Sequence, residues 1–311
     1  MATLRVGHVD LDTSHPQNWI PIVRELGHEV VGVFDGGTVW PEGYAKEFAA
    51  KLEVPRVYEC LDEMAEEVDL AIIHSANWDL HVPRARPFIE RGKGVLLDKP
   101  IVGNLRDVYT VREWVQSGAR VSGGSSLRFA AEIRAFLAKP VEERGEPAFA
   151  FVGCGVDEFN YGIHAYSTLL ALMGTGVELV RFLGAHGQRQ VEAVWKGGKR
   201  GILTVGQAGR WLPFYGTVVS DRAITHIVPD SSKLYRALLE TLLPYYAGER
   251  AAPLSFDELI EAELVALAAK CSWEQEGKRV YLNELRLDDR GYDGAAFAAG
   301  YRLQRLAATK K

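Results

Sequence analysis

The sequence has few cysteines and no long apolar run. Cys60, Cys154 and Cys271 are widely spaced and form no C-x-x-C pair, so they indicate neither a disulfide framework nor a cysteine-based zinc site. No stretch approaches the roughly eighteen apolar residues of a membrane-spanning helix. The first residues also lack a basic segment followed by an apolar one. We therefore expect a protein of the reducing cytoplasm that has no membrane partner.

A strong excess of either charge is also missing. The 36 Lys and Arg residues against 41 Asp and Glu residues give a formal net charge of -5, which argues against a nucleic-acid partner and against binding to anionic lipid. The hydrophobic content of 47% and the charged content of 25% are ordinary for globular domains. A chain of 311 residues has room for two such domains. The composition and charge leave open a small neutral molecule as the partner.

In the first part of the chain, short apolar runs alternate with segments of helical spacing. The runs expected to form strands are 4–9, 29–34, 57–58, 70–73, 95–97 and 121–122. This alternation predicts an α/β fold of the Rossmann type, a doubly wound parallel sheet over residues 1–124. The cluster Gly123-Gly124-Ser125-Ser126 is the predicted boundary.

The pattern changes after the boundary. Strand-like runs now follow one another with short turns such as Lys196-Gly197-Gly198-Lys199, and helices precede and follow them. Consecutive strands with tight turns indicate antiparallel pairing. Residues 125–311 are therefore predicted to form an α+β domain with an open, mainly antiparallel sheet.

The segment Val95-Leu96-Leu97-Asp98-Lys99-Pro100 reads as a buried strand that ends in a lysine. The carboxyl end of such a strand is where α/β sheets bind ligands. Lys99 is therefore either a surface residue leaving the sheet or an ammonium group aimed into the crevice.

The first turn between strand and helix lacks the G-x-G-x-x-G pattern that receives a dinucleotide pyrophosphate. Thr13, Ser14 and His15 can cap a helix beginning at Pro16 and offer N–H and hydroxyl groups to an anion. The preceding Asp10 and Asp12 place carboxylates nearby, and we expect them to weaken anion binding.

The same turn allows a metal interpretation, because two histidines and two aspartates suit a divalent cation. Its donors would be His8, Asp10, Asp12 and His15. The alternative is that His8 is a core histidine and the aspartates are turn and capping residues. We favour this alternative and predict no metal.

Asp35 ends the second predicted strand, where an acid accepts hydrogen bonds from the adenosine ribose. The next residues are Gly36 and Gly37 rather than an Arg or Lys that could neutralise a 2′-phosphate. NAD is therefore predicted in preference to NADP. A turn-forming role for Asp35 is compatible with this prediction.

Several of these segments resemble the Gfo/Idh/MocA oxidoreductases, the family of glucose-fructose oxidoreductase and inositol dehydrogenase. In that family a strand ends in Glu-Lys-Pro, and its lysine faces nicotinamide and substrate; here Asp98 replaces the glutamate before Lys99. The segment Ala76-Asn77-Trp78-Asp79-Leu80-His81 is similar to the family's loop beside the nicotinamide. The resemblance implies cofactor contacts for Asn77 and His81, and Trp78 is either a packing residue or a substrate-stacking one.

A second resemblance lies between 160 and 167, where the family has Asp-x-Gly-x-His-x-x-Asp. Here Asn160 and Ser167 stand in place of the two aspartates, and His164 matches the acid/base histidine. The resemblance implies substrate contacts for Lys99, Arg128, Asn160, Tyr161 and His164. It covers residues 4–282 and leaves the tail 283–311 unexplained.

The activity implied by this resemblance is NAD-dependent hydride transfer on a sugar, polyol or inositol-like secondary alcohol or ketone. Lys99 would bind the reacting oxygen, His164 would move its proton, and Asn160 would hold His164 or a neighbouring hydroxyl. A homodimer or homotetramer formed through the open sheet is expected. Two alternatives remain open: a ligand-sensing protein without turnover, and an NAD-using lyase or epimerase with an internal redox cycle.

Overall fold

The computed structural model describes residues 2–308, which fall into two compact units. The first unit contains 2–124, 239–256 and 293–308, and the second contains 125–238 and 257–292. The sequence predicts a single second domain from 125 onward. In the structure, 239–256 and 293–308 instead pack with the first unit.

The first unit is built on a five-stranded parallel sheet with the order β2-β1-β3-β4-β5. The strands are β1 (Arg5–Val9), β2 (Glu29–Phe34), β3 (Leu70–Ile73), β4 (Gly94–Asp98) and β5 (Val121–Gly124). Every residue of β3 and β4 is buried, as expected for parallel strands covered on both faces. The predicted doubly wound sheet is confirmed. The strand predicted at 57–58 reduces to one bridge between Val33 and Val57.

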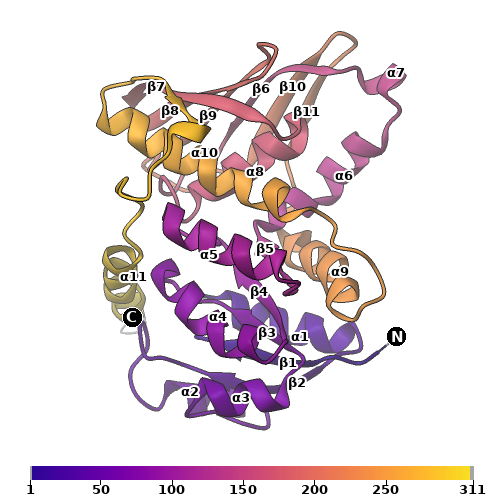
Figure 1. Cartoon of the computed structure of the whole chain (residues 1–311), viewed down its shortest axis with the longest axis vertical. Coiled ribbons are helices and arrows are strands. Elements are labelled where there is room, and N and C mark those ends of the chain that lie inside the picture. Colours follow the sequence, from indigo (N-terminus) through magenta and orange to yellow (C-terminus); the bar gives the residue numbers. More distant parts are fainter. Residues whose placement is uncertain (1, 309–311) are drawn as a thin grey trace. The chain divides into compact units, whose positions relative to one another are not determined.

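Helices cover both faces of this sheet (Figure 1). They are α1 (His15–Glu25), α2 (Tyr44–Lys51), α3 (Leu61–Glu67), α4 (His81–Glu90), α5 (Leu105–Gln116) and α11 (Gly294–Ala308), with the short turn η1 (Trp78–Leu80) before α4. The chain runs from β1 outward to β2 and then returns past β1 to β3, β4 and β5. The strand order therefore reverses between β1 and β3, and the crevice at their carboxyl ends is where doubly wound sheets bind ligands.

The end of α9 (Leu234–Tyr246) belongs to the first unit because Tyr246 is built into the sheet. Its ring is 2% exposed, and its hydroxyl donates to the Val95 carbonyl oxygen at 2.7 Å. Its own carbonyl oxygen accepts from Arg120 at 2.7 Å. A Cβ atom at Gly94 would lie only 2.7 Å from the Tyr246 ring, so the glycine leaves room for it.

Residues 294–308 of the tail that the family resemblance leaves unexplained form α11. The backbone N–H groups of Gly294 and Ala295 donate to the Asp79 carboxylate at 2.9 and 3.3 Å. Phe297 packs on Trp78, with ring centroids 5.0 Å apart. Trp78 is therefore a packing residue, and α11 covers the loop that follows β3.

The second unit contains a seven-stranded sheet with the order β11-β10-β6-β9-β8-β7-β12. Its strands are β6 (Pro147–Gly153), β7 (Val177–His186), β8 (Gln188–Trp195), β9 (Arg200–Val205), β10 (Tyr215–Ser220), β11 (Ile224–Ile227) and β12 (Val280–Tyr281). The pair β6 and β9 is parallel, and the other pairs are antiparallel. The predicted α+β unit with a mainly antiparallel sheet is confirmed.

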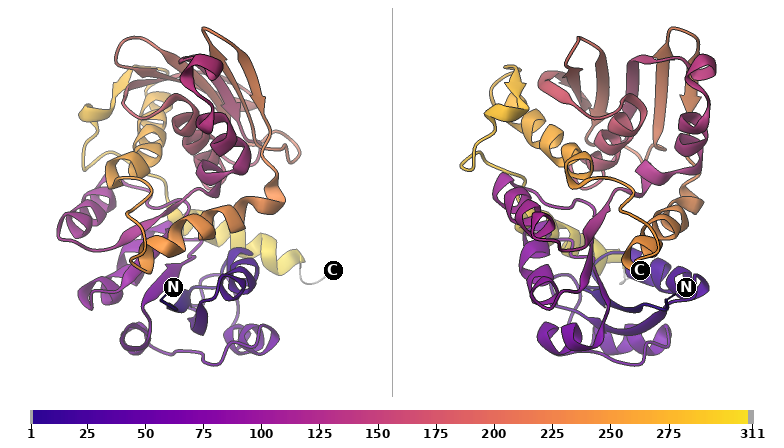
Figure 2. Two further views of the ribbon diagram at one scale, coloured as in Figure 1. Left: turned by 90° about the vertical axis from the view of Figure 1, so that its right-hand side faces the viewer. Right: turned by 45° about the vertical axis from the view of Figure 1, so that its right-hand side comes forward.

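One helix, α8, lies against this sheet along β6 and β9 (Figure 2). The helices and helical turns of this unit are η2 (Ser126–Phe129), α6 (Ala131–Ala138), α7 (Val141–Arg144), α8 (Gly162–Met173), η3 (Ser231–Lys233), α10 (Phe256–Glu274) and η4 (Leu282–Glu284). Leu169 of α8 approaches Gly201 of β9 so closely that a Cβ atom there would lie 2.5 Å away. Nearly all of α8 is buried, which fixes the orientation of its side chains. Among residues 2–308, no helix is both long enough and apolar enough to cross a membrane.

Replacing Tyr246 by Phe tests whether α9 stabilises the first unit. The change removes the hydroxyl that donates to Val95 and keeps the ring. A lost hydrogen bond of this kind costs about 1 kcal/mol. We expect the free energy of unfolding in urea to fall by about this amount. Tyr245→Phe, at the neighbouring half-buried tyrosine, serves as the control, and an equal loss in both variants would contradict the assignment.

Candidate cofactor site and active site

Asp10 holds the ends of three strands together. It adopts a left-handed backbone conformation with φ of 59° and is completely buried. Its carboxylate accepts hydrogen bonds from the Gly36 N–H at 2.9 Å and from the Ser75 hydroxyl, and it pairs with Arg84 at 3.2 Å. Aspartate tolerates this conformation better than most residues. Side-chain hydrogen bonds of Asp10 thus stabilise the loop at a position where the usual loop has a glycine.

Asp12 also points into the unit. It is completely buried, and its carboxylate accepts the Ala76 N–H at 2.8 Å. Burial, reinforced by the charge of Asp10, raises the pKa of Asp12 to about 8. Asp10 is thus paired with Arg84, and burial favours the protonated form of Asp12. The expectation that both carboxylates weaken anion binding at this loop stays a prediction.

The outer side of the turn is formed by Thr13, Ser14 and His15, which are partly exposed. The Thr13 hydroxyl accepts the His15 N–H at 3.1 Å, and Ser14 is the N-cap of α1. The positive end of the helix dipole lies at this point. The His15 ring turns away from the turn toward Asp98.

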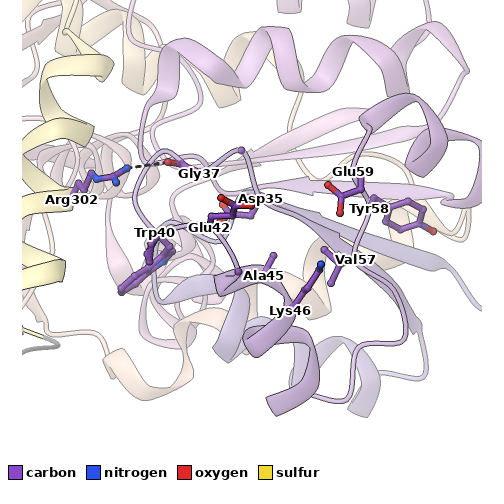
Figure 3. Close-up of a pocket in the computed structure, with 13 residues that line it drawn as sticks. Asp35, Gly37, Trp40, Glu42, Ala45, Lys46, Val57, Tyr58, Glu59 and Arg302 are labelled. Carbon is purple, nitrogen blue, oxygen red and sulfur yellow. Dashed lines mark hydrogen bonds between the residues drawn. The ribbon is translucent and has the colours of Figure 1, made fainter.

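Asp35 lines a cavity of about 420 Å³ at the end of β2 (Figure 3). Its carboxylate accepts the Leu11 N–H at 3.3 Å, and burial raises its pKa. Two cations, Lys46 and Arg302, also line the cavity. Arg302 comes from α11 and donates to the carbonyl oxygens of Gly37 and Thr38 at 3.1 Å each.

These cations lie where the 2′ position of an adenosine ribose held by Asp35 would bear a phosphate, so they bear on the choice between NAD and NADP. The sequence supplies no Arg or Lys directly after Asp35, whereas the fold brings one from 265 residues away. The choice of NAD over NADP therefore depends on whether Arg302 is engaged by the backbone or available to a ligand.

Asn77 and His81 both have structural partners. The Asn77 side chain accepts the Asp79 N–H at 3.1 Å and caps η1. His81 is completely buried, and its ring nitrogens lie 2.9 Å from the Ile101 carbonyl oxygen and 3.0 Å from the Ser75 carbonyl oxygen. His81 therefore joins the loop after β3 to the loop after β4.

Lys99 directly follows β4, so it leaves the sheet at the carboxyl edge. It is 9% exposed, and its backbone N–H donates to Asp98 Oδ1 at 2.7 Å. The surface interpretation of Lys99 is therefore wrong. Asp98 fixes the backbone of Lys99, and His81 holds the loop two residues further on.

His164 lies on α8 in the second unit. It is 6% exposed, and its ring stands edge-on to the rings of Tyr161 and Phe214 at 6.0 and 5.0 Å. Its Nδ1 lies 2.7 Å from the Ser125 hydroxyl. That hydroxyl also accepts the Leu127 N–H at 3.3 Å. A hydroxyl orients an imidazole but does not stabilise an imidazolium as a carboxylate does.

The sequence missed Ser125. In the sequence, the glycine-serine cluster that contains Ser125 indicates only a domain boundary. The hydrogen-bond partner of Ser125, His164, lies 39 residues further along the chain. Asn160 precedes α8 and is 8% exposed. The side chain within hydrogen-bond distance of His164 Nδ1 is that of Ser125. The tyrosine of the motif, Tyr161, contributes its ring to the surroundings of His164.

Arg128 follows Ser125 on η2 and is largely enclosed. Burial lowers the pKa of its guanidinium, and Glu258 and Glu261 of α10 partly offset that effect. Within residues 2–308, its Nη1 atom has no hydrogen-bond partner. A buried donor of this kind suits an oxygen atom of a ligand.

The model of the oxidoreductase family with an NAD-binding Rossmann fold, GFO_IDH_MocA, matches residues 12–122. The resemblance predicted from the sequence is thereby confirmed. A comparison with curated proteins found no match.

Solved structures share the fold across nearly the whole chain. Scyllo-inositol dehydrogenase from Lactobacillus casei, solved with NAD(H) and scyllo-inositol, is 13% identical, with a TM-score of 0.77 over 91% of this chain and 100% of that one. An oxidoreductase from Thermotoga maritima is 15% identical, with a TM-score of 0.76 over 92% and 100%. UDP-N-acetylglucosamine 3-dehydrogenase from Acidithiobacillus ferrooxidans is 17% identical, with a TM-score of 0.69 over 88% and 99%.

The raised pKa of Asp12 predicts a pH-dependent stability. With a pKa of about 8, Asp12 is protonated in the folded protein up to that pH, whereas the unfolded chain loses the proton near the ordinary aspartate pKa of 3.8. The contribution of Asp12 is thus fully present below pH 4 and is lost as the pH rises through 8. Asp12→Asn keeps an acceptor for Ala76 and should flatten this decline.

The measurement is the free energy of unfolding in urea at several pH values between 4 and 9. The exposed Asp288→Asn variant is the control and should follow the wild-type slope. A slope unchanged in Asp12→Asn would show that Asp12 is ionised in the folded protein.

Proposed function

We propose that this chain, a member of the oxidoreductase family with an NAD-binding Rossmann fold, catalyses NAD-dependent hydride transfer on a sugar, polyol or inositol-like secondary alcohol or ketone. The observation that carries the proposal is the position of Lys99, nearly buried at the carboxyl end of a central parallel strand inside the matched region. The inositol and sugar dehydrogenases of the same fold support this substrate class.

The residues of the first unit fit a nicotinamide dinucleotide. The start of α1 would receive the pyrophosphate through Thr13 and Ser14, since the carboxylates of Asp10 and Asp12 are turned inward. Asp35 and its cavity would hold the adenosine end. Asn77 would lie beside the nicotinamide, as the family resemblance implies. When bound, the cofactor accepts or supplies the hydride, and the protein contributes orientation and charge.

Lys99 would bind the reacting oxygen. Its ammonium group is a compact charge with three donors. It favours alkoxide character on the oxygen as the hydride leaves the carbon beside it. Because its backbone is fixed by Asp98, this charge would be in place before the substrate binds.

His164 would move the hydroxyl proton. With Ser125 at Nδ1, we assign proton exchange to Nε2. Asn160, Tyr161 and Arg128 would contact substrate hydroxyls. Because its partner is a neutral hydroxyl, His164 should be less basic than a histidine paired with a carboxylate.

The cofactor prediction is that NADH binds more tightly than NADPH. Asp35 should repel a 2′-phosphate, and Arg302 is already bonded to two carbonyl oxygens. The measurement is the dissociation constant of NADH and of NADPH, each determined by calorimetry. Tighter binding of NADPH would contradict it, and loss of that binding in Arg302→Ala would then identify Arg302 as the cause.

The catalytic prediction concerns Lys99 and His164. Lys99→Ala and His164→Ala should each lower turnover by about 10²–10⁴-fold, the usual range for general acid-base catalysis, while NADH binding survives. The double variant should lose less than the product of the two single losses, because both residues act on one oxygen. The assay is NADH formation with inositols and sugars as substrates.

Ser125→Ala separates positioning of His164 from simple packing. We expect the pH-rate profile to shift because the imidazole loses its partner. Ser126→Ala, at the neighbouring buried serine, is the control. Full activity of His164→Ala would refute the assignment. Ligand binding without turnover would favour the sensing alternative, and product without net NADH would favour the internal redox cycle.

A further inference from the structure

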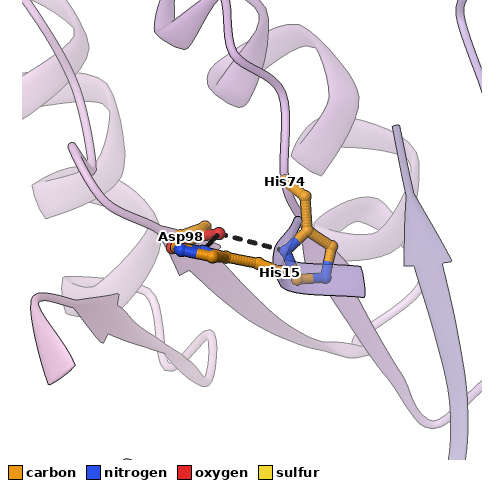
Figure 4. Close-up of side chains that lie close together, drawn as sticks. All are labelled: His15, His74 and Asp98. Carbon is orange, nitrogen blue, oxygen red and sulfur yellow. Dashed lines mark hydrogen bonds and ion pairs between the residues drawn. The ribbon is translucent and has the colours of Figure 1, made fainter. Parts of the chain in front are cut away.

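We propose that His15, His74 and Asp98 form a binding site for a divalent transition-metal ion, of which Zn²⁺ is the representative. This inference concerns the first unit alone and does not rest on the proposed function. The three side chains come from the start of α1, the residue after β3 and the last residue of β4. The three side chains lie close together (Figure 4). They meet at the carboxyl edge of the sheet, beside the point where the strand order reverses.

The donor atoms already converge. Asp98 Oδ2 lies 2.5 Å from His15 Nδ1 and 3.0 Å from His74 Nδ1, and all three atoms lie within 4.8 Å of one another. Two imidazole nitrogens and one carboxylate oxygen are a common ligand set for zinc and for non-haem iron. Such a set leaves further coordination positions for water or another ligand.

The movement required for a metal ion is small. With bonds of about 2.0–2.1 Å, neighbouring ligand atoms in a tetrahedral site lie about 3.3 Å apart. The two distances to Asp98 would therefore lengthen by less than about 1 Å. The two histidine nitrogens, which lie within 4.8 Å of each other, would approach by no more than about 1.5 Å. The ring of His15, whose side chain is 12% exposed, stands at the first residue of a helix. It provides both the adjustment and the route by which an ion enters.

The surroundings resemble the outer shell of a metal site. His74 Nε2 lies 3.0 Å from Nδ1 of the buried His8, so His74 can ligate through Nδ1 while its other nitrogen is held in place. Metal-bound histidines almost always have such a partner. Trp19 stacks on His15 at 5.4 Å and stands edge-on to His74 at 5.0 Å. Both rings are thus oriented by packing.

A metal ion binds a carboxylate and neutral imidazoles. It would therefore displace the protons that Nδ1 of His15 and Nδ1 of His74 share with Asp98.

The test uses the full-length, untagged protein after removal of metals with a chelator. Zn²⁺ is titrated by calorimetry, and Co²⁺ is titrated by its visible ligand-field absorption. We expect one ion per chain and an absorption typical of nitrogen and oxygen ligands. His15→Ala and Asp98→Asn should abolish this binding, and His8→Phe should weaken it by about 10–100-fold, the usual effect of losing an outer-shell partner.

The control is His226→Ala, at an exposed histidine of β11, which should bind both ions as the wild type does. His15 is the decisive position, because a partly exposed side chain is the least damaging to remove, and circular dichroism checks that the variant is folded. Absence of stoichiometric binding in the wild type would overturn the proposal and leave a hydrogen-bonded triad. Equal binding by wild type and His15→Ala would also overturn it.

Discussion

The buried carboxylate of Asp10 is the constraint on which the first unit depends. A charge without solvent must be paired and hydrogen-bonded, or it costs several kcal/mol. Asp10 meets this requirement with one group from the end of each neighbouring strand and with Arg84 of α4. A Cβ atom at Gly36 would lie 1.8 Å from the Arg84 guanidinium, so a larger residue there would displace the side chain that pairs with Asp10. At the base of the crevice, the ion pair between Asp10 and Arg84 thus stands where the usual loop has glycines.

A second buried carboxylate, Asp98, organises the next strand end. One oxygen holds the Lys99 backbone, and the other faces His15 and His74. The position of the candidate catalytic lysine is therefore coupled to two histidines. The sequence assigned one of them, His15, to the cofactor loop and did not single out the other, His74. An aspartate is one methylene shorter than the family's glutamate, which keeps its carboxylate beside its own strand end and within reach of the next backbone N–H.

The sequence predicted what depends on local periodicity and missed what depends on distant contacts. Buried apolar runs such as 95–97 identified the parallel sheet and placed Lys99 at its edge, because each strand carries its own signal. Arg302, Ser125 and Tyr246 reach their partners across 265, 39 and 151 residues. No spacing rule connects such positions. For the same reason, the sequence placed the residues of α11 in the second domain, whereas the structure places them in the first unit.

The loss of the glycine pattern need not remove anion binding at the start of α1. Two features reduce the negative charge at this loop: Asp10 pairs with Arg84, and burial raises the pKa of Asp12 to about 8. What remains is the positive end of the α1 dipole and the partly exposed Thr13 and Ser14. A buried aspartate that is protonated near neutrality therefore acts at this loop much as an amide would. Only above its pKa does it become the repulsive neighbour that the sequence suggests.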